Sequence, residues 1–334
     1  MIRSSLACWV AVVLAGCSEP STCELAPDLD PALLCLWTDS PGSPLIEPPA
    51  NHSIIADPTV VTPEDSPDGR WHMFAHALTA IYHYTSDDGL AWTEVGHLPF
   101  TLGSLRPYIY KEGATYYLLF EQYASLDSST IQIMESSDLV SWSESVTILE
   151  PTLDWETEGQ TRVGNPFVMA KDGEYWLYYS AGAVYLDDAS YDEPRYVGLA
   201  RATDLHGPYH KQPQPLVGPD PAVAWRNLGA GSMKLLQDRF GGEYVALENG
   251  IYEDGAGASR SAIQVLASAD GVSWREVCAA PPLAPTGTGW KQAFVYAFAT
   301  TRREGELRVY YNGRDGWLDG VERIGMSSVE LPCN

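Results

Sequence analysis

The stretch that decides the fold is Gly173-Glu174-Tyr175-Trp176-Leu177-Tyr178-Tyr179-Ser180, a turn glycine followed by a run of aromatic and aliphatic residues that ends in a polar one. Strands that are hydrophobic along nearly their whole length are covered on both faces. The pattern therefore predicts a buried strand inside a larger layered unit. Four other stretches repeat it, namely 69–76 (GRWHMFAH), 114–121 (ATYYLLFE), 242–249 (GEYVALEN) and 305–312 (GELRVYYN).

Each copy lies inside a repeated unit. A short apolar strand precedes it, and in the first four units a third strand follows and ends in a turn with Trp or Tyr, at 86–92, 137–142, 203–209 and 268–274. Asp in such turns is interpreted as a turn former rather than a catalytic group. Units of roughly 45–65 residues that lack helical periodicity indicate propeller blades. We therefore predict an all-β protein, a single five-bladed β-propeller with four-stranded blades over residues 50–334.

The predicted inner strands start near residues 56, 106, 165, 232 and 293. The outermost strand of the fifth blade is expected either from the region 30–40, which would close the ring, or from the stretch that ends at Leu331. A structure with six blades, or with a large second domain, would contradict this prediction.

The first residues of the chain are interpreted as a targeting signal. A short basic start precedes an apolar run, Leu6 to Leu14, that is too short to span a bilayer as a stable helix. The run ends in Leu14-Ala15-Gly16-Cys17, which resembles the lipobox of bacterial lipoproteins. That resemblance implies a signal peptide over 1–16, acylation of Cys17, a tether and packing segment over 17–49, and a location in the bacterial cell envelope, at the outer membrane. An ordinary cleaved signal peptide with a chance Cys is the alternative.

Export implies an oxidising compartment, in which disulfides form. Apart from Cys8 in the leader and Cys17, four cysteines remain, and four cysteines allow three pairings. We favour pairing within the N-terminal segment and within the C-terminal segment, because each bridge would tie down one end of the chain. These pairs are Cys23–Cys35 and Cys278–Cys333.

Charge restricts the partners. The chain has 20 Lys and Arg against 44 Asp and Glu, a formal net charge of −24, and this field repels nucleic acid and anionic lipid headgroups. The expected partner is a carbohydrate substrate or ligand, with membrane contact only through the N-terminal lipid. No Cys or His spacing suits a metal, so neither a metal nor a cofactor is predicted, and the protein is expected to be a monomer.

Two rings of polar residues are expected at one mouth of the central channel. The first ring starts the inner strands, three of which open with a residue before proline, which should hold that residue extended. Its members are Asp57, Arg106, Asn165, Ser232 and Gln292. The second ring ends the five repeated strands, where a polar residue follows an apolar run, as at the floor of a polar pocket. Its members are His76, Glu121, Ser180, Asn249 and Asn312.

Over about residues 50 to 331 the repeat, with its Ala56-Asp57-Pro58 start and Asp-Gly-x-x-Trp turns, resembles the five-bladed glycosidases. These are notably the family 43 arabinanases, arabinofuranosidases and xylosidases and the related family 32 fructosidases. The resemblance implies that Asp57 matches the acid that begins blade one. A second family acid begins blade three, where this chain has Asn165, and the proton donor, a Glu, begins blade four, where it has Ser232. Two of the three family acids are therefore missing.

Cleavage of a glycosidic bond needs two carboxyls. We predict Asp57 as the base or nucleophile and Glu121 as the proton donor, on the condition that Arg106 leans toward Asp57 and does not lower the pKa of Glu121. Glu248 is the alternative if Glu121 fails. The predicted substrate-binding residues are His76, Arg106, Asn165, Ser180, Ser232, Asn249, Trp290 and Asn312, with Trp155 and Trp317 as further candidate platforms for sugar rings.

Three functions are compatible with the predicted fold and its polar residues. The first is a glycoside hydrolase acting on poly- or oligosaccharides, of the arabinan or xylan type by resemblance. The second is a catalytically degenerate lipoprotein that binds carbohydrate. The third is a sialidase, which the Asp-box-like turn at 86–92 would suit, but sialidases have six blades and three convergent arginines, whereas Arg106 is the one evident channel arginine here.

Overall fold

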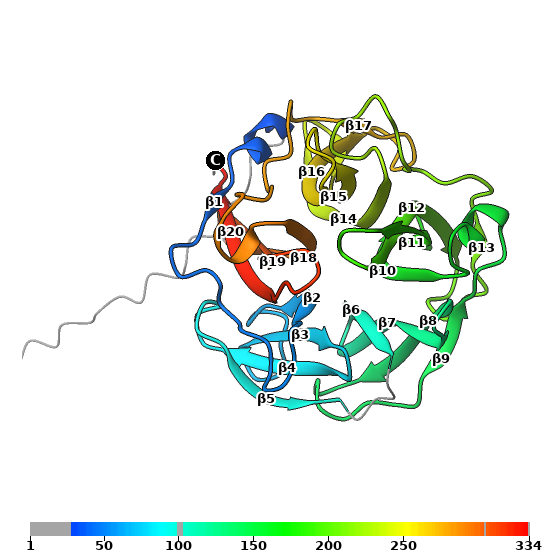
Figure 1. Ribbon diagram of the computed structural model, residues 1–334. Helices are drawn as coiled ribbons and strands as arrows, with labels where there is room; N and C mark the ends of the chain where they lie inside the picture. Colours follow the sequence, from blue (N-terminus) through cyan, green and yellow to red (C-terminus); the bar gives the residue numbers. More distant parts are fainter. Residues whose placement is uncertain (1–27, 99–102, 304, 333–334) are drawn as a thin grey trace, which may run out of the picture.

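The computed structural model describes residues 28–98, 103–303 and 305–332, and it is built from β-strands, with three short 3-10 helices in the described ranges. Four sheets lie around a common centre (Figure 1). No helix in this part of the chain is long and apolar enough to cross a membrane. The predicted all-β class is therefore correct, and Cys17 with the rest of the predicted signal and most of the tether lies outside the described residues.

Three sheets have four antiparallel strands each, in sequence order. The first contains β2 (Ala56–Val61), β3 (Trp71–Ala77), β4 (Ala80–Ser86) and β5 (Thr93–His97). The second contains β6 (Ser104–Glu112), β7 (Thr115–Ser125), β8 (Ser128–Ser136) and β9 (Val146–Leu149). The third contains β10 (Val163–Lys171), β11 (Glu174–Leu186), β12 (Tyr191–Ala202) and β13 (His210–Lys211).

The remaining sheet has eight strands in two antiparallel halves. One half contains β14 (Gly229–Phe240), β15 (Glu243–Glu253), β16 (Ser259–Ser268) and β17 (Arg275–Glu276). The other contains β18 (Phe294–Arg303), β19 (Glu306–Arg314), β20 (Glu322–Glu330) and β1 (Thr38–Asp39). A parallel pairing of Ser261 with Phe294 joins the two halves. Figure 1 shows β2, β6, β10, β14 and β18 nearest the centre, and these strands begin close to the predicted positions.

The N-terminal part of the chain completes the last half-sheet. Thr38 and Asp39 of β1 pair with Ser328 and Ser327 of β20, which is the first of the two predicted alternatives. The 3-10 helix η1 (Pro31–Cys35) precedes β1, and a disulfide links Cys35 to Cys278 with a Cα–Cα distance of 5.7 Å. The predicted pairings of Cys35 with Cys23 and of Cys278 with Cys333 are therefore wrong. The pairing of β1 with β20 places η1, which directly precedes β1, beside the β14–β17 half, where Cys278 lies.

The turns at the ends of the third strands have the predicted structural role. In the first of them Asp88 Oδ1 accepts hydrogen bonds from the backbone N–H groups of Leu90 and Ala91 at 2.7 and 2.9 Å, while Ser86 Oγ donates to the same oxygen. Asp138 and Asp270 make the same bonds in their turns. These aspartates lie at the opposite end of the strands from the candidate site.

All five inner strands contain an irregularity of register near their start, after the first one or two residues that pair with the second strand. In the first three blades the irregularity puts Asp57, Arg106 and Asn165 in the left-handed region, with φ of 52°, 54° and 47°. The expectation that proline holds these residues extended is therefore wrong. A β-bulge bends the strand locally and redirects a side chain, here toward the channel mouth, and non-glycine residues hold such angles at a cost of about 1–3 kcal/mol.

Candidate functional site

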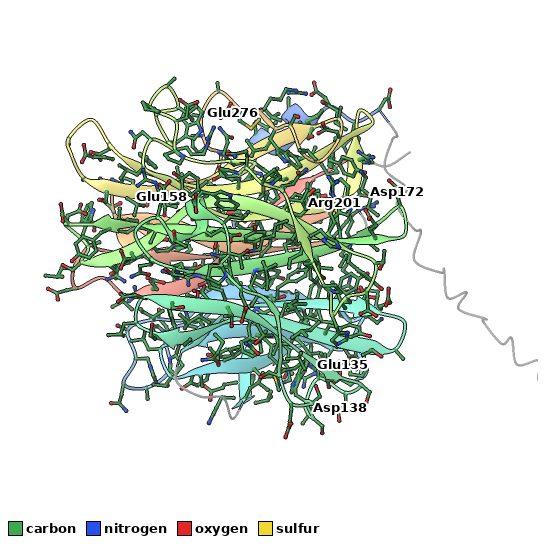
Figure 2. All side chains as sticks on the ribbon, turned by 90° about the vertical axis from the view of Figure 1, so that its right-hand side faces the viewer. Glu135, Asp138, Glu158, Asp172, Arg201 and Glu276 are labelled. Atoms are coloured by element: carbon green, nitrogen blue, oxygen red, sulfur yellow. A yellow bond between two sulfur atoms is a disulfide. The ribbon has the colours of Figure 1, made fainter. Side chains whose placement is uncertain are left out.

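The predicted second ring exists as a set of buried polar side chains at one mouth of the channel. Hydrogen bonds connect it to the first ring. Those from Asp57 to Asn312 and from Arg106 to His76 cross between neighbouring sheets, and that from Asn165 to Ser180 lies within one sheet. Figure 2 shows the strands from the side, with Glu158, before β10, toward the site end and Asp172, after β10, toward the other. The polar strand ends thus lie together, as expected of a pocket floor.

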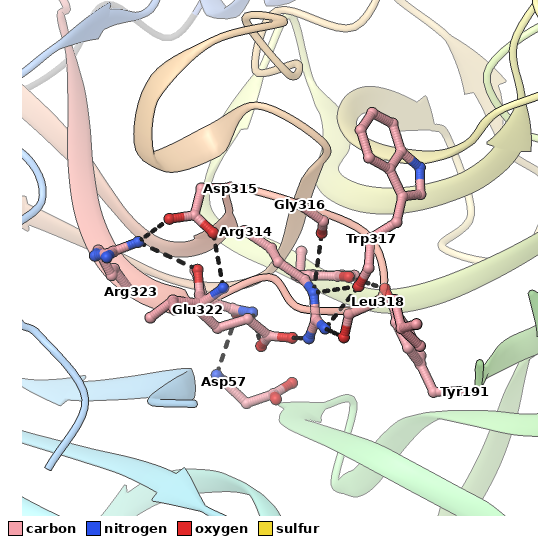
Figure 3. Close-up of polar contacts among 12 residues, drawn as sticks. Asp57, Tyr191, Arg314, Asp315, Gly316, Trp317, Leu318, Glu322 and Arg323 are labelled. Carbon is pink, nitrogen blue, oxygen red and sulfur yellow. Dashed lines mark hydrogen bonds and ion pairs between the residues drawn. The ribbon is translucent and has the colours of Figure 1, made fainter. Parts of the chain in front are cut away.

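Asp57 lies at the start of β2, and its side chain is 13% exposed. Its backbone N–H donates to Asn312 Oδ1 at 3.2 Å, the dashed line that leaves the nitrogen of Asp57 in Figure 3. Its Oδ2 lies 3.3 Å from His76 Nδ1. Burial lowers the pKa of His76 to about 4, so the imidazole is neutral, and its Nδ1 accepts a hydrogen bond from the backbone N–H of Arg106 at 3.3 Å. Asn312 therefore holds the backbone of Asp57, while the carboxylate beside His76 keeps an opening to solvent.

Glu121 is fully buried between two guanidinium groups. Its Oε2 lies 2.5 Å from Arg106 Nη1 and its Oε1 lies 2.9 Å from Arg162 Nη2. Burial alone would raise the pKa of Glu121, but the two arginines offset this and hold the pKa at about 2. A carboxylate in this state cannot supply a proton near neutral pH. Because Arg106 leans toward Glu121 and not toward Asp57, the predicted donor role of Glu121 is wrong.

Glu193 is the acidic residue that the sequence analysis missed. It lies near the start of β12, where it pairs with Val184 of β11, and it is buried. Burial raises the pKa of Glu193 to about 8; Glu322 and Asp57 act in the same direction, and Arg106 and Arg162 oppose it. The sequence contained one signal, since Glu193 precedes Pro194 in the same way that Asp57 precedes Pro58.

A third carboxyl belongs to Glu322 at the start of β20. Its Oε1 lies 3.0 Å from Arg314 Nη1, and its Oε2 accepts a hydrogen bond from Asn312 Nδ2 at 3.2 Å. Burial raises the pKa of Glu322 despite the ion pair with Arg314. Figure 3 shows this pair beside Asp57. Three carboxyls in unequal environments therefore share the mouth.

Lys234 of β14 is a buried cation that the sequence analysis also missed. Its Nζ donates to the backbone carbonyl of Phe298, and no carboxylate of the described residues forms an ion pair with it. Burial lowers the pKa of Lys234 to about 8, and the charge of Asp57 opposes that shift. Lys234 also lines a cavity of about 760 Å³ to which all five inner strands contribute.

Most of the predicted sugar-binding amides are occupied by protein groups. Asn165 Nδ2 donates to Ser180 Oγ at 2.9 Å, and Asn249 Nδ2 donates to the backbone carbonyl of Val295 at 3.0 Å. Asn312 uses its oxygen on Asp57 and its nitrogen on Glu322. Buried polar groups need hydrogen-bond partners. These amides supply partners for polar groups near the irregular starts of the inner strands. Ser232 Oγ, by contrast, has no hydrogen-bond partner in the described part of the chain.

The tryptophans predicted as sugar platforms are packed instead. Trp290 stacks on Tyr311 with ring centroids 5.5 Å apart and fills the space above Gly313 and Gly325. Trp155 is buried and donates to the carbonyl of Pro213. Trp317 donates to the carbonyl of Ser259, and the guanidinium of Arg260 lies over its ring. Each of the three rings is thus in contact with protein groups, and Trp155 is buried.

Glu248, the predicted alternative acid, does not join the site. It pairs with Met233 and Gln264 and is fully buried, and neither of its oxygens has a hydrogen-bond partner in the described residues. Burial raises the pKa of Glu248 to about 8, with Arg226 and Glu276 as the nearby charges. Successive side chains of a strand point to opposite faces, so a strand that directs Asn249 toward the channel directs Glu248 away from it. No group of three or more His, Cys, Asp or Glu side chains in the described ranges is arranged to hold a metal ion.

Comparison with known proteins identifies what this architecture resembles. Residues 102–235 match the family Glycosyl hydrolases family 43. Among solved structures, an α-L-arabinofuranosidase from Podospora anserina in complex with cellotriose superposes with a TM-score of 0.63 at 14% identity, covering 89% of this chain and 97% of that one. No curated protein sequence matches the chain.

Two further solved structures have similar folds. An N-acetylgalactosamine deacetylase from F. plautii gives a TM-score of 0.61 at 14% identity, covering 93% of this chain and 96% of that one. A thermostable family-43 glycoside hydrolase gives 0.59 at 12% identity, covering 84% of this chain and 93% of that one. At these identities the likeness concerns the fold. The chain therefore has a fold like that of the family 43 glycoside hydrolases.

Proposed function

We propose that the protein is a glycoside hydrolase that acts on arabinan- or xylan-type glycans, with Asp57 as the base or nucleophile and Glu193 as the proton donor. The observation that carries the proposal is a pair of carboxyls at one mouth whose environments differ. Glu193 is buried and its pKa is raised to about 8, whereas Asp57 is fixed through its backbone by Asn312 and its carboxylate opens to solvent. Two carboxyls with separated protonation states are the requirement for glycosidic cleavage.

In the proposed reaction Glu193 gives its proton to the glycosidic oxygen as the bond to the sugar breaks. Asp57 either accepts a proton from the attacking water or attacks the sugar carbon itself, in which case the ionised Glu193 later accepts a proton from water. Both routes consume one water. The route through attack by Asp57 returns both carboxyls to their starting states, whereas in the other route Asp57 ends with the proton that Glu193 has lost, and proton exchange with solvent restores the pair. The amide of Asn312 fixes the backbone of Asp57, and the neutral His76 lies beside the carboxylate without adding a charge.

Arg106 is proposed as the group that contacts a hydroxyl of the bound sugar. Its side chain is 15% exposed, and Glu121 holds it from the buried side. Arg162 shares the same carboxylate, so the cluster of Arg106, Glu121 and Arg162 keeps a net positive charge at the mouth. Glu121 therefore acts as a positioning residue in this proposal.

The substrate class rests on the family match over residues 102–235 and on fold neighbours named as an α-L-arabinofuranosidase and an exo-1,5-α-L-arabinanase. For the architecture, we interpret the eight-stranded sheet as two blades, because a parallel pairing at Ser261 and Phe294 joins two otherwise antiparallel four-stranded halves. With the other three sheets this interpretation makes a five-bladed propeller.

The experiment is a sugar-release screen of the purified protein against arabinan, xylan, fructan, mannan and galactan, with aryl glycosides beside them. We expect an arabinan- or xylan-type substrate to be cleaved, and Asp57→Asn to reduce kcat by about 10³-fold or more, because the base or nucleophile is removed. Circular dichroism checks that the variant folds. Cleavage that survives Asp57→Asn would contradict the assignment.

A glycan-binding protein without hydrolytic activity is the second candidate. It is favoured by one observation: Asn165 and Ser232 stand where the resembled families have acids, and Asn165 is already bonded to Ser180. The same screen separates the two functions, since binding measured by calorimetry without release of sugar would support the second. The proposed location is the bacterial cell envelope, with a lipid on Cys17; Cys17→Ala should then release the protein from the membrane fraction.

A further inference from the structure

The central channel contains a hollow at the end of the molecule opposite the candidate site. The candidate site lies where the five inner strands begin, whereas a cavity of about 760 Å³ lies among the residues toward their ends. We call this space the far cavity. Asp172, which belongs to its lining, marks this end of the molecule in Figure 2, opposite Glu158. The lining includes residues 59–62, 108–111, 167–172, 234–239 and 299–302.

The far cavity runs from the surface into the channel. Its lining includes Gln237 and Arg239 near the end of β14, which are exposed, whereas Lys234 of the same strand is buried. Nζ of Lys234 donates to the carbonyl of Phe298 in β18 and lies 5.8 Å from the centre of the Tyr108 ring in β6. Because groups from three inner strands meet here, this ammonium lies within the channel, at the inner end of the far cavity.

The ammonium of Lys234 lacks a close counter-charge. An ammonium has three N–H donors, and the carbonyl of Phe298 is the one hydrogen-bond acceptor that Lys234 uses within the described ranges. The charge of Asp57 acts on Lys234 without forming an ion pair with it. A buried charge without a partner is costly, so an anion in the far cavity would stabilise it.

The lining of the far cavity carries an excess of positive charge. Five cationic and three acidic side chains line it, in a chain with 20 Lys and Arg against 44 Asp and Glu. Lys234 and Arg239 have no acidic partner in the described part of the chain, whereas each acidic side chain has a cationic one. These pairs are Asp65 with Lys111 at 3.1 Å, Asp238 with Arg302 at 2.8 Å and Asp172 with Lys171 at 3.8 Å. The overall charge of the protein repels anions, but this surplus attracts one locally.

The other polar groups of the lining suit a sugar. Hydroxyl and amide side chains bind sugar hydroxyls, and the far cavity contains Thr62, Tyr110, Gln237 and Thr300. The single buried ammonium supplies one positive charge, and the three aspartates of the same lining would repel a second negative charge. A carboxylate with one charge therefore fits better than a sulfate or phosphate with two. A sugar that carries one carboxylate is a uronate.

We propose that the far cavity is a second binding site, which takes a small uronate and holds its carboxylate on Lys234. The uronate supplies the counter-charge that Lys234 lacks, and its hydroxyl groups face the polar side chains of the lining. The far cavity and the candidate site lie at opposite ends of the channel. Uronate binding requires no glycosidic cleavage, so this inference does not depend on the proposed hydrolytic function.

The test is calorimetric titration of the purified protein with glucuronate and galacturonate, with glucose and galactose as neutral counterparts and sulfate as a dianion. Burial lowers the pKa of Lys234 to about 8, so its ammonium is charged at about pH 7. At least one uronate is expected to bind, with one molecule per chain. It should bind about tenfold or more tightly than its neutral counterpart, and more tightly than sulfate.

Lys234→Met is expected to raise the Kd of the uronate about tenfold or more, because a hydrogen bond between charged groups is lost. Methionine fills the buried space without a charge, so this variant should fold, which circular dichroism checks. Lys111→Met is the matched control. It removes one charge from the same lining, but Lys111 is already paired with Asp65, so the Kd should change less than about threefold. Arg106→Gln removes a cation at the candidate site and should leave the Kd unchanged.

Binding of neither uronate, or tighter binding of sulfate than of both, would overturn the proposal. Equal weakening by Lys234→Met and Lys111→Met would do the same, because the ligand would then respond only to the overall charge of the lining. Loss of binding in Arg106→Gln would place the uronate at the candidate site instead. A uronate that binds the parent and Arg106→Gln alike, and that Lys234→Met no longer holds, supports the second site.

Discussion

Glu193 illustrates how one side chain can set a pH dependence. Its raised pKa of about 8 means that the folded protein holds this proton through neutral pH, whereas an unfolded chain would lose it near the ordinary value of a Glu. If Glu193 is the donor, kcat/KM on a natural glycoside should fall as pH rises through about 8. Glu193→Gln should abolish that activity, and on an activated aryl glycoside, which needs no donor, it should remove the alkaline decline.

A matched control exists in the same chain. Burial raises the pKa of Glu248 to about 8 as well, but Glu248 lies away from the channel beside Arg226. Glu248→Gln should therefore leave the pH profile of kcat/KM unchanged. Because each of these carboxyls has a higher pKa in the folded protein than in the unfolded chain, its contribution to stability declines as pH rises from the ordinary pKa of a Glu toward 8. Glu193→Gln and Glu248→Gln should therefore each make the free energy of unfolding decline less over that range. An unchanged alkaline limb in Glu193→Gln would contradict the donor assignment.

At the scale of the element, the inner strands position the site through their irregular starts. Gly164 of β10 shows why the local sequence matters: a Cβ at this position would overlap Glu121 Oε2. The absence of a side chain at Gly164 lets the carboxylate of Glu121 reach Arg106 and Arg162. The start of β10 therefore leaves the space that the cluster of Arg106, Glu121 and Arg162 needs, and Arg106 and Glu121 come from the neighbouring sheet.

Gly164→Ala is expected to destabilise the protein by about 1–3 kcal/mol, since overpacking a tight site forces side chains to move. It should also lower activity, because Arg106 would lose its fixed position. Urea unfolding measures the stability change, and Gly255→Ala is the control, as a Cβ at Gly255 meets nothing within 4 Å. Equal stability of the two variants would show that Glu121 has room to shift.

At the scale of the whole molecule, the ring is closed by the N-terminal segment. Strand β1 pairs with β20, and Lys291 Nζ lies 2.6 Å from Asp39 Oδ2 beside that pairing. The Cys35–Cys278 disulfide then attaches η1 to the β14–β17 half, across 243 residues of sequence. Closing a long loop lowers the entropy of the unfolded chain, which stabilises the fold.

Replacing both Cys35 and Cys278 by Ser should reduce the free energy of unfolding by about 2–4 kcal/mol. Urea unfolding of the oxidised parent, the reduced parent and the double variant measures this change. The reduced parent and the double variant should unfold at the same urea concentration. If all three unfold together, the disulfide contributes nothing to the stability of the ring.

The repeat was readable from the sequence because its causes are local. A buried second strand needs a continuous apolar run such as 175–179, a tight turn needs the Asp of Asp88 or Asp270, and a strand that ends at the mouth changes to a polar residue such as His76 or Asn312. These patterns recur with the same spacing in successive units. They therefore predicted the all-β class, the inner strand starts and the buried polar residues at the ends of the second strands.

What the site does chemically was decided by tertiary structure. The sequence could not show that Glu121 faces Arg162, 41 residues away, nor that Glu193 reaches the mouth from a third strand that the alignment of second strands did not cover. Likewise, the pairing of Cys35 with Cys278 depends on where ring closure places η1. Charge and pKa depend on distances between blades, and those distances arise only when all the sheets have packed around one axis.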